Sequence, residues 1–258
     1  MGRMHLFEFE DQSWCPHFIR EATTDFLFTL YGLMGMYESA FEKIVEVLNK
    51  TKFNTIIDCC SGSGGAVQYL REYLDKIDNK STTITLTDKF PNIKSFRELE
   101  ASYPNGIIAH EESLDATQLP KKMKGMRTFF SSFHHFRPEM AVKILQNAVN
   151  ADAPIGIFEC TRRHPLEFLT VLFNPIVTLL VLPFSKKLNW SKFLFTYLIP
   201  ITPFTTMWDY FASNMRTYSP KELNELISNL DAPNYQWEIG KIKSKRGNCI
   251  VTYLIGYK

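Results

Sequence analysis

The segment from Thr55 to Glu159 alternates short β-branched or apolar runs with amphipathic stretches, and this order constrains the fold more than any other feature of the chain. Strands are expected at 55–59, 83–87, 106–110, 128–132 and 155–159, and helices at 65–77, 91–102 and 138–149. Repeats of strand and helix at this spacing form a parallel sheet that is covered by helices. The segment is therefore expected to be the centre of an α/β domain.

Helices and two further strands flank this segment. Residues 15–50 have helical periodicity, an apolar insertion follows residue 159, and a helix is expected at 220–229. The last two strand-like runs, 235–241 and 249–256, are close enough along the chain to pair antiparallel.

These elements predict an α/β fold with a Rossmann-like seven-stranded, mostly parallel sheet. The sheet would end in an antiparallel C-terminal hairpin, with N-terminal helices before it and an apolar helical insertion after strand 5. The length of 258 residues suits a single domain, 1–258. Within it, 1–52 is expected to form an N-terminal helical lid and 164–218 an apolar helical cap.

Charged residues are nearly balanced, with 29 Lys and Arg against 27 Asp and Glu, so the net charge is only +2. A nucleic-acid-binding surface needs a basic excess, and no nucleic-acid partner is expected. The five cysteines form no CxxC pair, which argues against a disulfide framework and against a structural zinc site. We therefore expect a cytoplasmic protein without a metal centre.

Glycines and acids recur where the expected strands end. The turn after the first strand, 58–65, reads DCCSGSGG. Gly62 and Gly64 allow a sharp turn and the close approach of a ligand, and the helix start that follows favours an anionic group. Asp88 ends the second strand, where a carboxylate can accept hydrogen bonds from ribose hydroxyls. Asp115 follows the third strand, where it can meet the exocyclic amine of an adenine.

These residues resemble the motifs of the class I S-adenosylmethionine-dependent methyltransferases, over roughly residues 53–160 by motif. By that resemblance, the motif that holds the methionine part of the cofactor comprises Asp58, Cys60, Ser61, Gly62 and Gly64. The other implied cofactor contacts are Asp88 at the ribose, Asp115 and Ala116 at the adenine, and Lys89 and Ser131. Cys60 stands where the usual pattern has its first glycine. The resemblance implies S-adenosyl-L-methionine as the cofactor.

A NAD(P)-dependent oxidoreductase would share the glycine turn and the ribose acid. Its GxGxxG pattern needs a third glycine at position 67, where this chain has valine. The sequence therefore favours the methyl donor over the dinucleotide.

Two histidines and a glutamate are candidate catalytic residues. His134 and His135 lie just after the fourth strand, in the segment that lines the methyl-transfer site in the resembled family. An imidazole with an ordinary pKa of about 6.5 can remove a proton from an acceptor oxygen or nitrogen, and His135 is preferred. The alternative is that one histidine caps the next helix and the other packs. Glu159, at the end of the fifth strand, is the third candidate.

Four residues are candidates for contacting the acceptor: Trp14 and Arg20 in the lid, Arg162 after the fifth strand, and Trp208 in the insertion. An arginine can hold a carboxylate or phosphate with two parallel hydrogen bonds. A lid is expected because methyl transfer needs alignment and exclusion of water. For each of the four, the alternative is packing or ordinary surface exposure.

The insertion contains two stretches without charged residues, 168–185 and 193–208, separated by a segment with Lys186, Lys187 and Lys192. Prolines interrupt both stretches, so no clean membrane span is predicted. Three uses of the insertion are open: a cap over an apolar substrate, a hairpin at a membrane interface, and a homodimer interface.

The sequence as a whole predicts S-adenosylmethionine-dependent methyl transfer to a small hydrophobic or lipid-like acceptor. An alternative of a different class is a non-catalytic module of the same fold, which uses the insertion to bind a membrane or a partner. The acceptor atom, whether oxygen, nitrogen, carbon or sulfur, is not encoded in these patterns.

Overall fold

The computed structural model describes residues 2–12, 14–79, 81–185, 189–246 and 249–258. The chain divides into two compact units. The first, here the helical unit, comprises Met1–Met34 and Thr161–Tyr218. The second, here the sheet unit, comprises Gly35–Cys160 and Ser219–Lys258.

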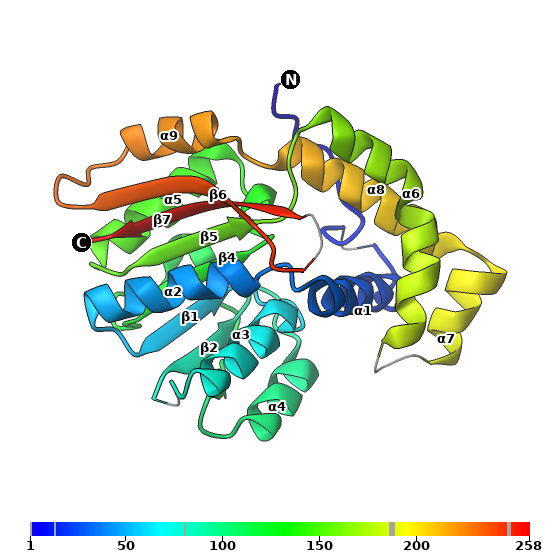
Figure 1. Ribbon diagram of the computed structural model, residues 1–258, viewed down its shortest axis with the longest axis horizontal. Helices are drawn as coiled ribbons and strands as arrows, with labels where there is room; N and C mark the ends of the chain where they lie inside the picture. Colours follow the sequence, from blue (N-terminus) through cyan, green and yellow to red (C-terminus); the bar gives the residue numbers. More distant parts are fainter. Residues whose placement is uncertain (1, 13, 80, 186–188, 247–248) are drawn as a thin grey trace. The chain divides into compact units, whose positions relative to one another are not determined.

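The sheet unit is built on a sheet that has seven strands among the described residues, in the order β3-β2-β1-β4-β5-β7-β6. The strands are β1 (Thr55–Cys59), β2 (Thr83–Thr87), β3 (Ile107–Ala109), β4 (Met126–Phe130), β5 (Ile155–Glu159), β6 (Gln236–Lys243) and β7 (Ile250–Tyr257). β1 to β5 are parallel, while β7 pairs antiparallel with both β5 and β6 (Figure 1). The predicted fold class is therefore confirmed.

Helices cover both faces of this sheet, so its central strands are almost wholly buried. The helices of the sheet unit are α2 (Glu38–Thr51), α3 (Gly65–Lys76), α4 (Ile93–Ser102), α5 (Pro138–Asn150) and α9 (Pro220–Ser228), with the short turns η1 (Ala116–Gln118) and η2 (Phe133–His135). α2 and α3 lie on one face and α5 on the other (Figure 1). α5 starts with Pro138 and buries Ala141, Ile144, Leu145 and Ala148, the spacing of an amphipathic helix.

The fourth strand begins and ends two residues before its predicted range of 128–132. Its pairing with β5 stops at Phe130 opposite Phe158. Ser131 then turns the chain, with a φ of +42°. The apolar pattern could not locate this end because Phe129 to Phe133 reads as one continuous run of strand-compatible residues.

The helical unit contains α1 (His17–Met34), α6 (Pro165–Val181), η3 (Leu182–Phe184), α7 (Trp190–Phe193), the π-helical turn η4 (Leu194–Leu198) and α8 (Ile201–Arg216). α6 starts at Pro165, and the His164 side chain caps it by accepting a hydrogen bond from the Leu166 amide. α6 and α8 lie side by side (Figure 1). A small apolar cluster of Phe26, Val181 and Leu182 joins α1 to the end of α6.

Candidate functional site

The glycine turn after β1 is organised around the buried carboxylate of Asp58. One carboxylate oxygen of Asp58 accepts a hydrogen bond from the Ser61 hydroxyl at 2.6 Å, and the other accepts one from the Thr128 hydroxyl at 2.8 Å. Thr87, at the end of β2, donates its hydroxyl to the Asp58 carbonyl at 2.7 Å. The turn is thus tied to both strands that flank β1.

Burial raises the pKa of Asp58 to about 7, while the hydrogen bonds from Ser61 and Thr128 act in the opposite direction. A carboxyl group with this pKa changes its charge near neutral pH. A cation bound beside Asp58 would therefore lower the pKa of its carboxyl group and favour the carboxylate.

Cys60 occupies the position of the motif's first glycine and adopts the backbone conformation that glycine favours there. Its φ is +57°, in the left-handed region, which is unusual for a residue with a Cβ atom. Gly62 and Gly64 follow with φ of +56° and +78°. The turn therefore keeps its shape despite the substitution.

The two glycines have different surroundings. A Cβ atom added to Gly64 would clash with a methyl carbon of Leu99, and the positive φ of Gly64 also disfavours any other residue. A Cβ atom added to Gly62 would meet nothing within 4 Å. Open space beside the Gly62 backbone is what the close approach of a ligand requires.

Asp88 connects the end of β2 to this turn. One oxygen of its carboxylate accepts a hydrogen bond from the Gly62 amide at 2.9 Å, and the other accepts one from the Phe90 amide at 2.8 Å. Phe90 itself is 82% exposed. The acid is therefore fixed at the edge of the sheet and not folded into the core.

The loop after β3 joins the same edge. Asp115 accepts a hydrogen bond from the Lys89 ammonium at 3.1 Å and two from Thr117, which lower the pKa of its carboxyl group. The Leu114 amide also donates to the Asp88 carbonyl at 2.9 Å. Ala116, the neighbour of Asp115, is buried. Three segments far apart in the sequence thus meet at the carboxyl edge of one sheet.

Comparisons with known proteins identify the fold. No protein-family model and no curated protein matches the sequence. An O-methyltransferase from neocarzinostatin biosynthesis, crystallised with S-adenosylmethionine and 2-hydroxy-5-methyl naphthoic acid, is similar over 92% of this chain, with a TM-score of 0.54 and 14% identity. Human N-acetylserotonin methyltransferase, crystallised with S-adenosylmethionine, is similar over 93% of this chain, with a TM-score of 0.50 and 14% identity.

This chain has the fold of the class I S-adenosylmethionine-dependent methyltransferases. At such low identity the likeness concerns the fold. The matches cover 58% and 57% of the two solved chains, so this chain corresponds to less than two thirds of either.

In this methyltransferase fold, His134 and Glu159 form a buried pair where β4 and β5 end. His134 Nδ1 lies 2.8 Å from one carboxylate oxygen of Glu159, and the His134 amide donates to the other at 3.1 Å. His135 stacks on His134, with ring centroids 4.4 Å apart, and is only partly buried. Nδ1 of His134 therefore faces the Glu159 carboxylate, and Nε2 lies on the other side of the ring.

Ser131 belongs to a hydrogen-bond network that the sequence did not reveal. Its hydroxyl oxygen accepts hydrogen bonds from the Tyr37 hydroxyl at 2.7 Å and from the Cys160 amide at 3.2 Å. Tyr37 is buried just before α2, and no local pattern distinguishes it from a core tyrosine. Thr128 was also missed, although a threonine in a buried strand beside Asp58 is a readable signal.

The four predicted acceptor residues all belong to the helical unit, where each has a contact. Arg20 donates to the carbonyls of Glu10 and Gln12, and Arg162 pairs with Glu167 at 2.5 Å. The Trp208 indole donates to the Phe7 carbonyl at 3.0 Å, and Trp14 packs edge-on against Phe9. Their assignment to an acceptor is still a prediction.

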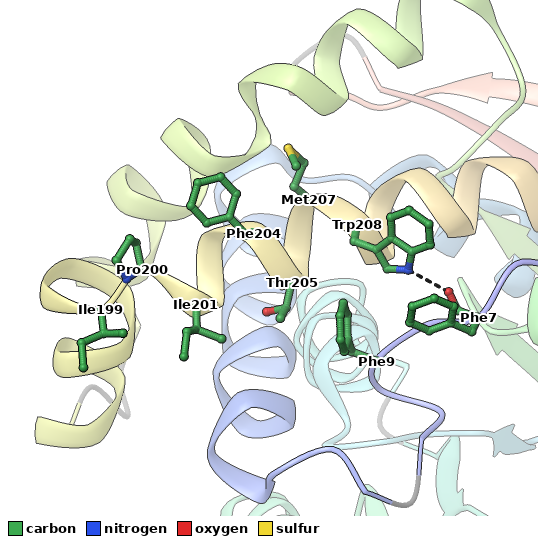
Figure 2. A pocket seen from close by; sticks show the side chains of 9 residues that line it. All are labelled: Phe7, Phe9, Ile199, Pro200, Ile201, Phe204, Thr205, Met207 and Trp208. Atoms are coloured by element: carbon green, nitrogen blue, oxygen red, sulfur yellow. Dashed lines mark hydrogen bonds between the residues drawn. The ribbon is translucent and has the colours of Figure 1, made fainter.

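The helical unit also contains an apolar groove of about 610 Å³ beside the start of α8. Phe7, Phe9 and Trp208 close one end, and Ile199, Ile201 and Phe204 extend towards the other (Figure 2). Its volume lies within the range of about 300–1,000 Å³ typical of small-molecule sites. The hydrogen-bonding groups of its wall are already used: the Thr205 hydroxyl donates to the Thr202 carbonyl, as the Trp208 indole does to Phe7. The groove therefore suits a hydrocarbon.

Proposed function

We propose that this protein transfers a methyl group from S-adenosyl-L-methionine to a small hydrophobic or lipid-like acceptor. The observation that supports this most strongly is the hydrogen bond from the Gly62 amide to the Asp88 carboxylate, because it joins the glycine turn to the ribose acid. The Lys89–Asp115 ion pair adds the third segment to the same edge. The fold agrees with this function.

The residues at this edge suit the proposed cofactor. The open space at Gly62 admits a ligand close to the backbone, Asp88 can accept from ribose hydroxyls, and Asp115 with Ala116 can face an adenine. Asp58 supplies negative charge beside the turn, and Cys60, Ser61, Gly64, Lys89 and Ser131 complete the proposed cofactor contacts. The bound cofactor would supply the electrophilic methyl group; the protein would supply alignment and exclusion of water.

His134 is the proposed general base, with Glu159 as its positioning residue. Glu159 accepts from Nδ1 and fixes the ring, so Nε2 can take the proton of an acceptor hydroxyl or amine as the methyl group is transferred. His135, the preferred candidate from the sequence, has the stacking contact with His134 but is not the partner of Glu159 in this pair. We therefore assign the proton transfer to His134.

Acceptor binding is assigned to the helical unit, through Trp14, Arg20, Arg162 and Trp208. The apolar groove supports a hydrophobic acceptor, because its lining is almost wholly apolar and the Thr205 and Trp208 donors already have acceptors. The five cysteines lie in the described part of the chain and are not joined in disulfides there, which suits a reducing, cytoplasmic setting. The predicted membrane contact and homodimer both concern the apolar insertion and not the cofactor edge.

Calorimetric titration with S-adenosylmethionine and with S-adenosylhomocysteine tests this proposal. Asp88→Ala should weaken binding by about 100-fold or more, because hydrogen bonds to a carboxylate are lost. Asp231→Ala, which removes an exposed carboxylate before β6, is the matched control and should bind as the parent protein does. No binding by the parent protein would favour the non-catalytic module, and binding of NADH instead would favour the oxidoreductase.

A further inference from the structure

The helical unit exposes many large apolar side chains of α6 and buries several polar ones. Along α6, the residues that face outwards include Leu169, Leu172, Phe173, Ile176 and Leu180, each more than half exposed. Their spacing of three and four residues places them on one face of the helix. The stripe that α6 buries is instead Val171, Asn174, Thr178 and Val181. Half of this buried stripe is polar, whereas an amphipathic helix of a water-soluble protein buries a mainly apolar stripe.

Polar contacts hold the interior of this unit together. The Thr178 hydroxyl of α6 lies 2.9 Å from the Thr206 hydroxyl of α8, and both side chains are buried. The Lys192 ammonium is fully buried and forms an ion pair with Asp25 of α1, with Glu21 3.4 Å away. Hydrogen bonds between helices, with apolar side chains outside, are typical of helices in lipid.

Charges are almost absent from the outer surface of this region. Among the described residues from 165 to 204, the only charged ones are Glu167 and Lys192. Glu167 pairs with Arg162, and Lys192 is inside the unit. Exposed aromatic residues continue the apolar surface beyond α6, at Phe184 and Trp190. Lys186 and Lys187, which the sequence places between these two aromatic residues, lie outside the described residues.

The length and one-sided packing of α6 decide how such a surface can meet a membrane. Pro165–Phe184 is the one stretch in the described ranges long and apolar enough to cross a bilayer. Its mean hydropathy is 1.9, and only 28% of its apolar stretch is buried. α6 packs against α8 along one side and leaves its other side exposed. It also carries Pro175 and ends in η3 at Pro183. These features fit a helix that lies in the interface, not across it.

We infer that the helical unit docks on a phospholipid bilayer through this apolar face, defined as the exposed residues of α6, Phe184 and Trp190. A protein partner fits less well, because protein interfaces carry roughly one hydrogen bond per 100–200 Å² and these exposed side chains are hydrocarbon or aromatic. Lys186 and Lys187 in the sequence beside the face complement an anionic headgroup. The inference goes beyond the proposed methyl transfer and does not depend on it.

The apolar groove extends the same docking surface along the chain. Leu198 at the end of η4, Ile199, and Phe204 of α8 are exposed apolar residues, and the last two line the groove (Figure 2). A hydrocarbon chain from the bilayer is the occupant that needs no hydrogen bond from Thr205 or Trp208, whose donors are already used.

Vesicle flotation of the full chain tests the docking. The probes are vesicles of phosphatidylcholine alone and of phosphatidylcholine with phosphatidylglycerol. The parent protein should float with both and more strongly with the anionic vesicles. The Leu172→Glu/Phe173→Glu variant should bind vesicles at least about tenfold more weakly. The reason is that two large apolar side chains that would enter the bilayer are replaced by charged ones. Ile77→Glu, at an exposed apolar position of the sheet unit, is the control and should float like the parent.

A second measurement does not depend on the folding of a charged variant. Trp190 fluorescence should be quenched by lipids with brominated acyl chains, measured as the difference between the parent protein and Trp190→Phe. Absence of this difference, or flotation that is equal for the face variant and the parent, would overturn the docking. A concentration-dependent dimer that the face variant abolishes, without flotation of the parent, would assign the face to self-association instead. S-adenosylhomocysteine titration of the face variant separates these outcomes from failure of the proposed function.

Discussion

The two units of this protein distribute polar and apolar residues in opposite ways. In the sheet unit, Phe129 and Ile157 are buried and the exposed positions are mostly polar. In the helical unit, Thr178 is fully buried while Phe173 is 60% exposed. The sheet unit is therefore stabilised by apolar burial away from water. The helical unit contains more polar contacts in its interior, and many of its large apolar side chains are exposed.

The largest effect is expected from the buried ion pair of the helical unit. Lys192→Met leaves Asp25 buried without its closest cation and should lower the free energy of unfolding by about 3–5 kcal/mol. The Lys192→Met/Asp25→Leu variant removes both charges and should recover most of that loss. Urea unfolding measures the free energy of unfolding of the parent protein, the single variant and the double variant. A single variant as stable as the parent would contradict a polar interior for this unit.

Truncating Phe129 of the sheet unit and Phe173 of the helical unit should change the free energy of unfolding by different amounts. Phe129→Ala removes a fully buried ring that packs edge-on against Phe133, and should cost about 3–5 kcal/mol of unfolding free energy. Phe173→Ala shortens an exposed side chain, and in the absence of lipid it should change the free energy of unfolding by less than about 0.5 kcal/mol. The same urea titrations compare them. Equal losses would mean that Phe173 is packed as Phe129 is.

The cofactor edge of the sheet unit is expected to respond to pH. The folded pKa of Asp58 is raised to about 7, so its protonated form is favoured and stability falls as pH rises from the unfolded pKa towards 7. A cationic cofactor favours the carboxylate, so affinity should increase about tenfold between pH 6 and pH 8. Calorimetry in buffers of different ionisation enthalpy should also detect proton release at the lower pH. Asp58→Asn is the control, and an unchanged pH dependence in it would exclude this carboxyl group as the cause.

The smallest effect concerns the backbone of the glycine turn. The left-handed φ of +57° at Cys60 is energetically unfavourable for a residue with a Cβ atom, whereas glycine adopts it without strain. Cys60→Gly should therefore be more stable than Cys60→Ala by about 1 kcal/mol, since both variants lose the thiol and only alanine keeps a Cβ atom. Thermal unfolding of the two variants measures the difference. The same order of stability would not be expected at a position with negative φ.

Local sequence patterns predicted much of the sheet unit because its elements follow from short-range chemistry. Alternation of strands and helices fixed the parallel order, and the acids at Asp88 and Asp115 stand where strands end. The bond from Tyr37 to Ser131 joins residues 94 positions apart, and no local pattern carries such information. Likewise, no local pattern says which of His134 and His135 contacts Glu159.

For this chain, the sequence alone determined the alternating fold, the glycine turn and the existence of an apolar insertion, since each depends on the order of neighbouring residues. Only the tertiary structure decided that Cys60 keeps a glycine-like conformation and that α6 turns its leucines outwards. The number of apolar residues in α6 does not determine which face of this helix packs against the neighbouring helices. That side is chosen by long-range contacts such as the Thr178–Thr206 pair, which form only when distant segments pack together.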